Sequence, residues 1–207
     1  MRLRSISPIL IATGNPGKVR EMRSLLADIL VGLRSLADYQ DICGVAETGS
    51  TFNENARLKA VGYARQTRLW SLADDSGLEV AALNGEPGIY SARYGGDEAS
   101  FQVRMGIILE KMKISEYKGR EARFACSMAL ADPDGRLIAE VEGDCTGRIS
   151  FGPMGSGGFG YDPIFIPNGF DKTFGELPES IKQNISHRAR AAKKIIRYLL
   201  DFTGTLT

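Results

Sequence analysis

Four segments of the chain carry residues whose types and spacing could do chemistry. The first, ATGNPGK (Ala12 to Lys18), is typical of a strand end, a glycine turn and a helix start. Free backbone N–H groups and the helix dipole favour an anion there, and Lys18 adds a positive charge. The segment lacks the second glycine and the Lys-Ser/Thr pair of a Walker A loop. Phosphate binding is therefore one interpretation, and an ordinary strand-to-helix turn is the other.

The second group of residues is acidic. Glu47 lies just ahead of a predicted helix, and Asp74-Asp75 comes at the predicted end of a strand. Hard cations such as Mg²⁺ prefer carboxylate and phosphate oxygens, and usually need only one or two protein carboxylates. Because strand side chains alternate between faces, Asp74 and Asp75 should point apart, with one of them structural, unless the strand has already turned. The sequence Asp-Ser-Gly is also typical of a turn that simply ends a strand.

The third segment is the glycine-rich GSGGFGYD (Gly155 to Asp162). Missing side chains let a ligand or another part of the backbone come close. Phe159 or Tyr161 could stack on a flat base. Core aromatics beside a surface loop are an equally common reason for such a pattern.

The fourth segment is SIKQNISHRARAAKK (Ser180 to Lys194), in which Ser186 is predicted to cap the last helix. His187 and Arg188 then occupy its first turn, where positive charge opposes the helix dipole by roughly 0.3 to 1 kcal/mol. A bound anion or a carbonyl-bearing ligand would relieve that conflict. His187 is the only histidine of the chain, and a lone histidine is more often a core or surface residue than a catalyst. A solvated helix face is predicted from Arg190, Lys193, Lys194 and Arg197.

Composition limits the classes of function. The 207 residues suit one α/β domain or two tightly joined lobes, and a net charge of +1 offers no field for nucleic acid. No stretch approaches the roughly 20 apolar residues of a membrane span, and the N-terminus does not resemble a signal peptide. We therefore expect a cytoplasmic protein that binds neither membrane nor nucleic acid. Cys43, Cys126 and Cys145 lie far apart and are expected to be reduced packing residues.

Alternating strands and helices must position these segments. Asn15 and Pro16 are a suitable N-cap and first residue for a helix that ends near Gly32, and Thr51 with Glu54 forms a capping box. Asp132 to Gly135 suits the turn of a hairpin. The predicted strands are 7–13, 68–75, 78–83, 121–131, 136–145 and 161–166, and the remaining predicted helices are 99–114 and one that begins at Ser186.

Taken together, five blocks in order resemble the Ham1 family of inosine and xanthosine triphosphate pyrophosphatases, which remove non-standard purine nucleotides from the precursor pool. The blocks are TGNPGK, ETGSTFNENARLKA, ADDSGLEVAALNGEPGIYSARYGG, GSGGFGYDPIF and SHR. Gly175 stands where the family usually has alanine, and the acid-rich stretch before Lys182 is thinner here. The match nevertheless spans most of the chain.

The resemblance implies an elongated α/β fold, in which residues 1–207 form a single domain of two lobes. A mixed β-sheet flanked by helices and a central cleft belong to this fold, and a homodimer is implied as well. A purine nucleoside triphosphate would be the substrate, and Glu47 and Asp75 would bind Mg²⁺, with Asp75 also the general base. The residues that would hold the nucleotide are Thr13, Gly14, Asn15, Pro16, Gly17, Lys18, Ser76, Phe159, Gly160, Tyr161, Asp162, Lys182, His187 and Arg188.

The implied reaction is attack of water on the α-phosphorus of ITP, dITP or XTP, which yields the nucleoside monophosphate and pyrophosphate. The donors of Arg188 would suit a 6-oxo purine and disfavour adenine, whereas exclusion of GTP needs a further element. Two alternatives stay open at this point. One is a sensor that binds purine triphosphates without cleaving them, and the other is a pyrophosphatase for other modified nucleotides.

Overall fold

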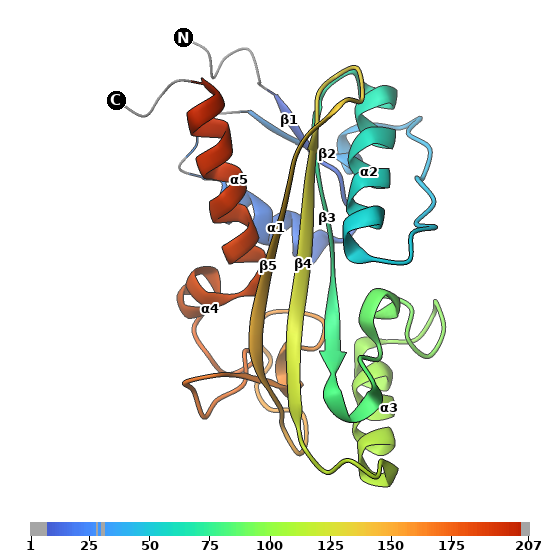
Figure 1. Ribbon diagram of the computed structural model, residues 1–207, viewed down its shortest axis with the longest axis vertical. Helices are drawn as coiled ribbons and strands as arrows, with labels where there is room; N and C mark the ends of the chain where they lie inside the picture. The colour runs from blue at the N-terminus through green and yellow to red at the C-terminus, as the bar shows by residue number, and fades with distance from the viewer. Residues whose placement is uncertain (1–7, 28, 30–31, 204–207) are drawn as a thin grey trace. The chain divides into compact units, whose positions relative to one another are not determined.

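The computed structural model describes residues 8–27, 29 and 32–203 (Figure 1). Its strands are β1 (Ile9–Ile11), β2 (Leu33–Ser35), β3 (Trp70–Val80), β4 (Glu121–Ala131), β5 (Leu137–Ile149) and β6 (Phe165–Pro167). Its α-helices are α1 (Pro16–Leu25), α2 (Phe52–Thr67), α3 (Phe101–Ile114), α4 (Glu179–Ile185) and α5 (His187–Thr203). No helix in this part of the chain has the length and apolar character needed to cross a membrane.

The strands of the described chain form one mixed sheet in the order β2-β1-β3-β4-β5-β6. Strand β1 pairs in parallel with β2 and β3, and β5 pairs antiparallel with β6. The predicted mixed α/β fold is therefore confirmed. The chain divides into two compact units, of which the first comprises 1–75, 126–143 and 188–207, and the second comprises 76–125 and 144–187.

The first unit has a three-layered arrangement, with α1 and α5 on one face of the sheet and α2 on the other (Figure 1). Alternation along β1 explains it, because Ile9 and Ile11 pack with α1 and α5 while Leu10 packs with α2. In the second unit, a core cluster joins Leu78 and Val80 of β3 to Ile108 of α3. Each unit thus buries its own apolar side chains.

Helix α1 begins as predicted, but it ends earlier than predicted. The Asn15 side chain accepts hydrogen bonds from the backbone N–H groups of Gly17, at 2.8 Å, and Lys18, at 3.2 Å. The helix ends at Leu25, so the prediction that Gly32 terminates it was wrong. Gly32 lies next to β1 instead, since its carbonyl accepts the N–H of Ile9. The strand predicted for 7–13 is confirmed for residues 9–11, and Ser7 lies outside the described residues.

Strand β3 is continuous through Asp74, Asp75, Ser76 and Gly77, so the predicted turn at this point was wrong. The reason is tertiary pairing. Strand β1 pairs with the first residues of β3, and further along, Val80 donates to the Glu86 carbonyl while Leu78 donates to the Ser91 hydroxyl. With these partners the chain stays extended in spite of a Ser-Gly sequence typical of turns. The strand predicted for 78–83 is the end of β3 followed by a 3₁₀ turn.

The remaining elements agree with the sequence in part. The hairpin of β4 and β5 is confirmed, with Asp132 Oδ1 accepting the N–H groups of Asp134 and Arg136. The strand predicted for 161–166 is reduced to β6, because residues 162–164 form a 3₁₀ turn that contains Pro163. Helix α4 was not predicted. The last hydrogen bond of α4 runs from the N–H of Ser186 to the carbonyl of Lys182. The backbone of Ser186 is extended, and it separates α4 from α5.

The cysteines differ from one another in exposure. Cys126 and Cys145 are buried packing residues as expected, and burial raises the pKa of the Cys126 thiol to about 12. Cys43 is exposed, so the expectation that it packs in the core was wrong.

Candidate functional site

The two neighbouring acids of β3 lie on opposite faces of the strand. Asp74 contacts Lys18 of α1 and Arg188 of α5, whereas Asp75 contacts residues of α2. Because β3 does not turn, strand alternation acts on the pair as the sequence predicted. The two carboxylates therefore have separate sets of partners, all within the first unit.

Asp74 is a buried carboxylate held by two cations. Its Oδ2 atom lies 3.1 Å from Lys18 Nζ and 3.2 Å from both Nε and Nη2 of Arg188. Burial alone would raise the pKa of Asp74, but the charges of Lys18 and Arg188 hold it well below its usual range. Its two cations make Asp74 an anchor for α1 and α5 rather than a candidate proton acceptor.

Arg188 carries a positive charge at the start of α5, where the helix dipole opposes it. It is 2% exposed, and its Nη1 donates to Glu21 of α1 while its other donors bind Asp74. Burial lowers the pKa of Arg188, but Asp74 and Glu21 outweigh that effect and raise it. The sequence suggested a bound anion or carbonyl as the relief for this charge. Two carboxylates of the protein itself supply it.

Asp75 belongs to a second cluster, which faces α2. Lys59 Nζ lies 3.0 Å from Asp75 Oδ1 and 3.1 Å from Glu47 Oε2. Asn55 Nδ2 donates to Asp75 Oδ2 at 3.3 Å, and Asn55 Oδ1 accepts the N–H of Gly49 at 2.8 Å. A Cβ atom on Gly49 would lie 2.8 Å from that oxygen, so glycine is required for the approach. Glu47, Asp75 and the start of α2 are thereby joined in one network.

Lys59 and Asn55 are residues that the sequence reasoning missed. Both are buried, and they lie four residues apart on α2. They are next to Ala56 and Ala60, which belong to the buried stripe of the same helix. Polar residues at one-turn spacing beside an apolar stripe were the available signal, because such side chains must find buried partners.

The electrostatics of the second cluster suit proton transfer. Burial raises the pKa of Asp75, and Glu47 adds to the rise while Lys59 and Lys18 oppose it. For Lys59, burial lowers the pKa, but the neighbouring carboxylates Asp75, Asp74 and Glu47 outweigh it and raise the pKa. A carboxylate with a raised pKa is a better proton acceptor than an exposed aspartate.

The cluster also fits a divalent cation that is shared with a ligand. Glu47 and Asp75 contact the same ammonium group, so one positive charge can lie close to both carboxylates. The described residues contain no group of three or more His, Cys, Asp and Glu side chains that could hold a metal alone. Mg²⁺ held here would need further oxygens from phosphate or water, as is usual for this ion.

The segment Ala12 to Lys18 forms a strand end followed by a well-capped helix start. Asn15 satisfies the N–H groups of Gly17 and Lys18, and the Thr13 hydroxyl accepts the N–H of Asn15 at 3.2 Å. Gly14 is exposed, and nothing lies within 4 Å of the place where its Cβ would be. Lys18 points to Asp74. Hydrogen bonds therefore fix the backbone around Asn15, whereas the space beside Gly14 is unoccupied by protein atoms.

In the second unit, Asp162 organises the glycine-rich segment. Its Oδ2 atom accepts the N–H of Phe159 at 2.7 Å and forms an ion pair with Lys182. Lys182 Nζ also lies 4.6 Å from the centroid of the Phe159 ring. Gly158 has φ +69°, and a Cβ there would lie 2.0 Å from Asp162 Oδ2. The missing side chain is therefore needed for the backbone to approach the carboxylate.

The two aromatics of this segment differ in exposure. Tyr161 is 3% exposed and packs edge-on against Phe101, with ring centroids 5.4 Å apart. Phe159 is half-buried. Of the two rings considered for base stacking, the Tyr161 ring belongs to the core and only Phe159 is accessible.

The last two expected residues of the second unit are His187 and Ser76. The His187 ring is buried and stacks on Phe124, with centroids 4.7 Å apart and planes inclined by 14°. Ser76 is half-buried on β3 directly after Asp75. The structure thus places His187 in a core contact and Ser76 beside the candidate base.

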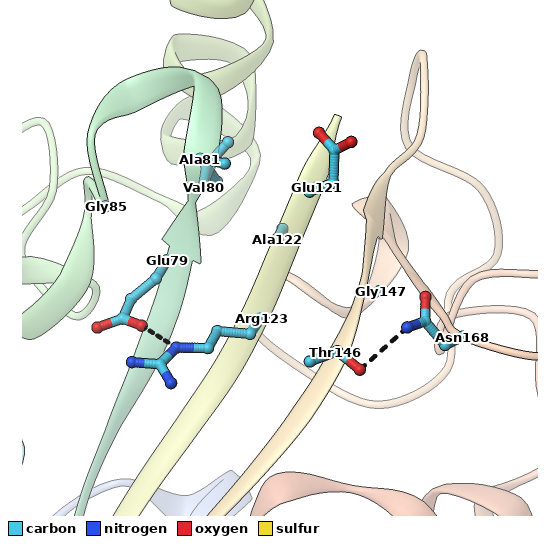
Figure 2. Close-up of a pocket in the computed structure, with 10 residues that line it drawn as sticks. All are labelled: Glu79, Val80, Ala81, Gly85, Glu121, Ala122, Arg123, Thr146, Gly147 and Asn168. Atoms are coloured by element: carbon cyan, nitrogen blue, oxygen red, sulfur yellow. Dashed lines mark hydrogen bonds and ion pairs between the residues drawn. The ribbon is translucent and has the colours of Figure 1, made fainter. Parts of the chain in front are cut away.

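Figure 2 shows a cavity of about 490 Å³ in the second unit, lined by the ends of β3, β4 and β5. None of the residues that line it is a site residue predicted from the sequence. Two pairs of its lining residues contact each other, since Arg123 forms an ion pair with Glu79, and Asn168 donates to the Thr146 hydroxyl (Figure 2). This cavity is therefore separate from the residues with candidate chemistry.

Comparison with known proteins shows which family the chain belongs to. The sequence pattern of the Ham1 family matches residues 9–198. The chain belongs to the Ham1 family. Relatives of this Ham1 chain include a dITP/XTP pyrophosphatase of Halalkalibacterium halodurans, 46% identical over 190 residues that cover 92% of this chain and 97% of the relative. One from Geobacillus kaustophilus is 47% identical over 196 residues, covering 95% and 96%.

Solved structures of the Ham1 family share the fold. A Ham1 protein from Coxiella burnetii has a TM-score of 0.83 at 38% identity, covering 93% of this chain and 98% of that one. The Ham1 protein of Staphylococcus aureus has a TM-score of 0.79 at 39% identity, covering 93% and 97%. The mixed sheet with its flanking helices is therefore the Ham1 fold.

We predict that Arg188→Met destabilises this Ham1 protein by about 3–5 kcal/mol, because it removes the buried guanidinium from both Asp74 and Glu21. Urea unfolding followed by circular dichroism measures the change. Arg190→Met is the matched control, since Arg190 is exposed on the same helix and should change stability by less than about 0.5 kcal/mol. Equal effects of the two substitutions would contradict a structural role for the Arg188 ion pairs.

Proposed function

We propose that this chain hydrolyses the non-canonical purine nucleoside triphosphates ITP, dITP and XTP to the nucleoside monophosphate and pyrophosphate. The observation that carries the proposal is the cluster in which the buried Asp75 and Lys59 meet the exposed Glu47. It places a carboxylate of raised pKa in a chain whose relatives are dITP/XTP pyrophosphatases. A protein that only senses nucleotides would have no use for such a proton acceptor.

In the proposed reaction, Asp75 accepts a proton from a water molecule whose oxygen attacks the α-phosphorus. The bond from that phosphorus to the oxygen that bridges to the β-phosphorus breaks, and pyrophosphate leaves with the electron pair. Lys59 and Asn55 hold the Asp75 carboxylate in place. When bound by Glu47 and Asp75, Mg²⁺ would neutralise charge on the phosphates.

The rest of the proposed site divides between phosphate and base. The triphosphate is assigned to Thr13–Lys18, where the exposed backbone at Gly14 lets a phosphate approach and Lys18 offers charge at the helix start. The base is assigned to Phe159 for stacking, within the segment that continues through Gly160, Tyr161 and Asp162. The other proposed contacts are Ser76, Lys182, His187 and Arg188.

For Arg188 the geometry sharpens this assignment. Its Nη1 and Nη2 groups are bound to Glu21 and Asp74. A direct contact from Arg188 to a 6-oxo group would have to share or exchange these bonds. We therefore propose that Arg188 acts first by fixing Asp74, which in turn holds the Lys18 ammonium at the helix start.

A panel of substrates tests the proposed function. Pyrophosphate release should be fast with ITP, dITP and XTP, and at least about tenfold slower with ATP, because a site built for a 6-oxo group leaves an unpaired donor against a 6-amino group. Removal of Mg²⁺ with a chelator should abolish release. GTP and dTTP complete the panel. Release mainly from dTTP would favour a pyrophosphatase for other nucleotides, and binding without any release would favour the sensor.

We predict that Asp75→Asn lowers kcat for ITP by at least about 10²-fold, because the amide cannot accept the proton. ITP binding, measured by calorimetry, should persist. Asp144→Asn is the control, since Asp144 is an exposed residue of β5, and it should leave the rate unchanged. Near-normal turnover by Asp75→Asn would remove Asp75 from the role of general base.

We also propose that the protein is a cytoplasmic homodimer. Most of the large apolar side chains that are exposed in the described residues lie in the second unit, at Tyr90, Val103, Ile114, Tyr117, Phe151 and Met154. A subunit interface on the second unit would cover such side chains. Light scattering coupled to size exclusion should give about twice the 22.5 kDa chain mass, and a monomer mass at micromolar concentration would contradict the proposal.

A further inference from the structure

Ser91 is a buried residue that connects three parts of the second unit. Its hydroxyl accepts the N–H of Leu78 on β3 at 2.9 Å and donates to the carbonyl of Gly88 at 2.6 Å. Its own carbonyl accepts the hydroxyl of Tyr161 at 2.9 Å. A strand, a turn and the glycine-rich segment thus meet at one residue.

The bond to Leu78 lies where β3 extends beyond its pairing with β1. Strand β1 pairs only with the first residues of β3, at Trp70 to Leu72. Further along, the segment that contains Ser91 lies next to β3, with a bridge between Glu79 and Pro87 and a bond from Val80 to Glu86. The Ser91 hydroxyl therefore satisfies a buried N–H group of the strand that also carries Asp75.

The bond to Tyr161 fixes the glycine-rich segment. Phe159, Gly160 and Tyr161 are consecutive, and Gly158 and Gly160 both have positive φ, at 69° and 66°. Such glycines restrain the backbone little, so the position of Phe159 depends on its anchors. One anchor is Asp162, which accepts the N–H of Phe159. Another is the buried Tyr161 ring, whose hydroxyl donates to the backbone carbonyl of Ser91.

We propose that Ser91 is a positioning residue, which through Tyr161 holds the glycine-rich segment so that Phe159 is ready to stack on the purine. The inference rests on the proposed function, because it takes Phe159 as the base-stacking residue. Ser91 itself touches no substrate in this proposal. Its effect should therefore be on the affinity for the base and not on the contacts to phosphate.

The test compares a ligand that has a purine with one that lacks it. Calorimetry on the full chain would measure the Kd of IMP and the Kd of inorganic triphosphate. Tyr161→Phe loses the hydrogen bond to the Ser91 carbonyl and should raise the Kd of IMP about three- to tenfold, the effect expected for loss of one hydrogen bond. Ser91→Ala keeps that carbonyl but loses the hydroxyl bonds to Leu78 and Gly88 that hold it in place, so it should raise the Kd of IMP in the same direction. The Kd of inorganic triphosphate should stay within about twofold. The same variants should raise KM for ITP with little change in kcat.

Tyr94→Phe is the matched control. Tyr94 also donates its hydroxyl, but to the exposed Glu86, and it has no bond to the glycine-rich segment. This variant should bind IMP like the wild type. Tyr161→Phe keeps the ring in the core, so the test stands even if Ser91→Ala fails to fold in a thermal melt.

The outcomes distinguish a failure of the positioning role of Ser91 from a failure of the proposed function. Wild-type IMP affinity in Tyr161→Phe, or equal losses for IMP and inorganic triphosphate, would overturn the positioning role, even if the wild type cleaves ITP. If the wild type binds IMP but releases no pyrophosphate from ITP, the proposed function fails, while a selective loss of IMP affinity would still support Ser91. A wild type that does not bind IMP would overturn the positioning role, and pyrophosphate release from ITP would decide the proposed function separately.

Discussion

Neighbouring side chains on an extended strand point to opposite faces, and in β3 this constraint acts on two adjacent aspartates. Because the strand continues through Asp74 and Asp75 without a turn, the two carboxylates cannot share a partner set. Each is buried, and a buried charge is tolerated only with an opposite charge or hydrogen bonds beside it. The positions of the surrounding cations follow from that requirement.

The two acids consequently have opposite electrostatic properties although they are adjacent in sequence. Asp74 faces Lys18 and Arg188, and its pKa is far below the ordinary value. Asp75 faces one lysine and a second carboxylate, Glu47, and its pKa is raised. Pairs of carboxylates whose pKa values are pushed apart commonly divide the work of a site. Here Asp74 holds α1 and α5 against the sheet through Lys18 and Arg188, and Asp75 is the candidate proton acceptor.

The sequence was most informative where local rules decide the structure. Asn15-Pro16 defined the start of α1, Thr51 that of α2, and strand alternation separated Asp74 from Asp75. The sequence predicted wrongly where tertiary pairing overrides a local preference. The Ser-Gly of β3 is typical of a turn, but residues 86–91 hydrogen-bond to the strand and keep it extended. The partners of Arg188 also escaped prediction, since Glu21 and Asp74 are remote from it in the chain and no local pattern connects them.

Lys59 shows how the same constraint reaches residues that no motif singled out. Once Asp75 points toward α2, a buried cation must come from that helix, and only the buried face of α2 can supply it. Lys59 meets this need, and Asn55 one turn earlier adds a hydrogen bond to the same carboxylate. Both lie beside the alanines that pack against the sheet. A lysine in an apolar stripe would be unfavourable by itself. Beside Asp75 and Glu47 it keeps its charge, and its charge in turn keeps the two carboxylates close enough to act on one ligand.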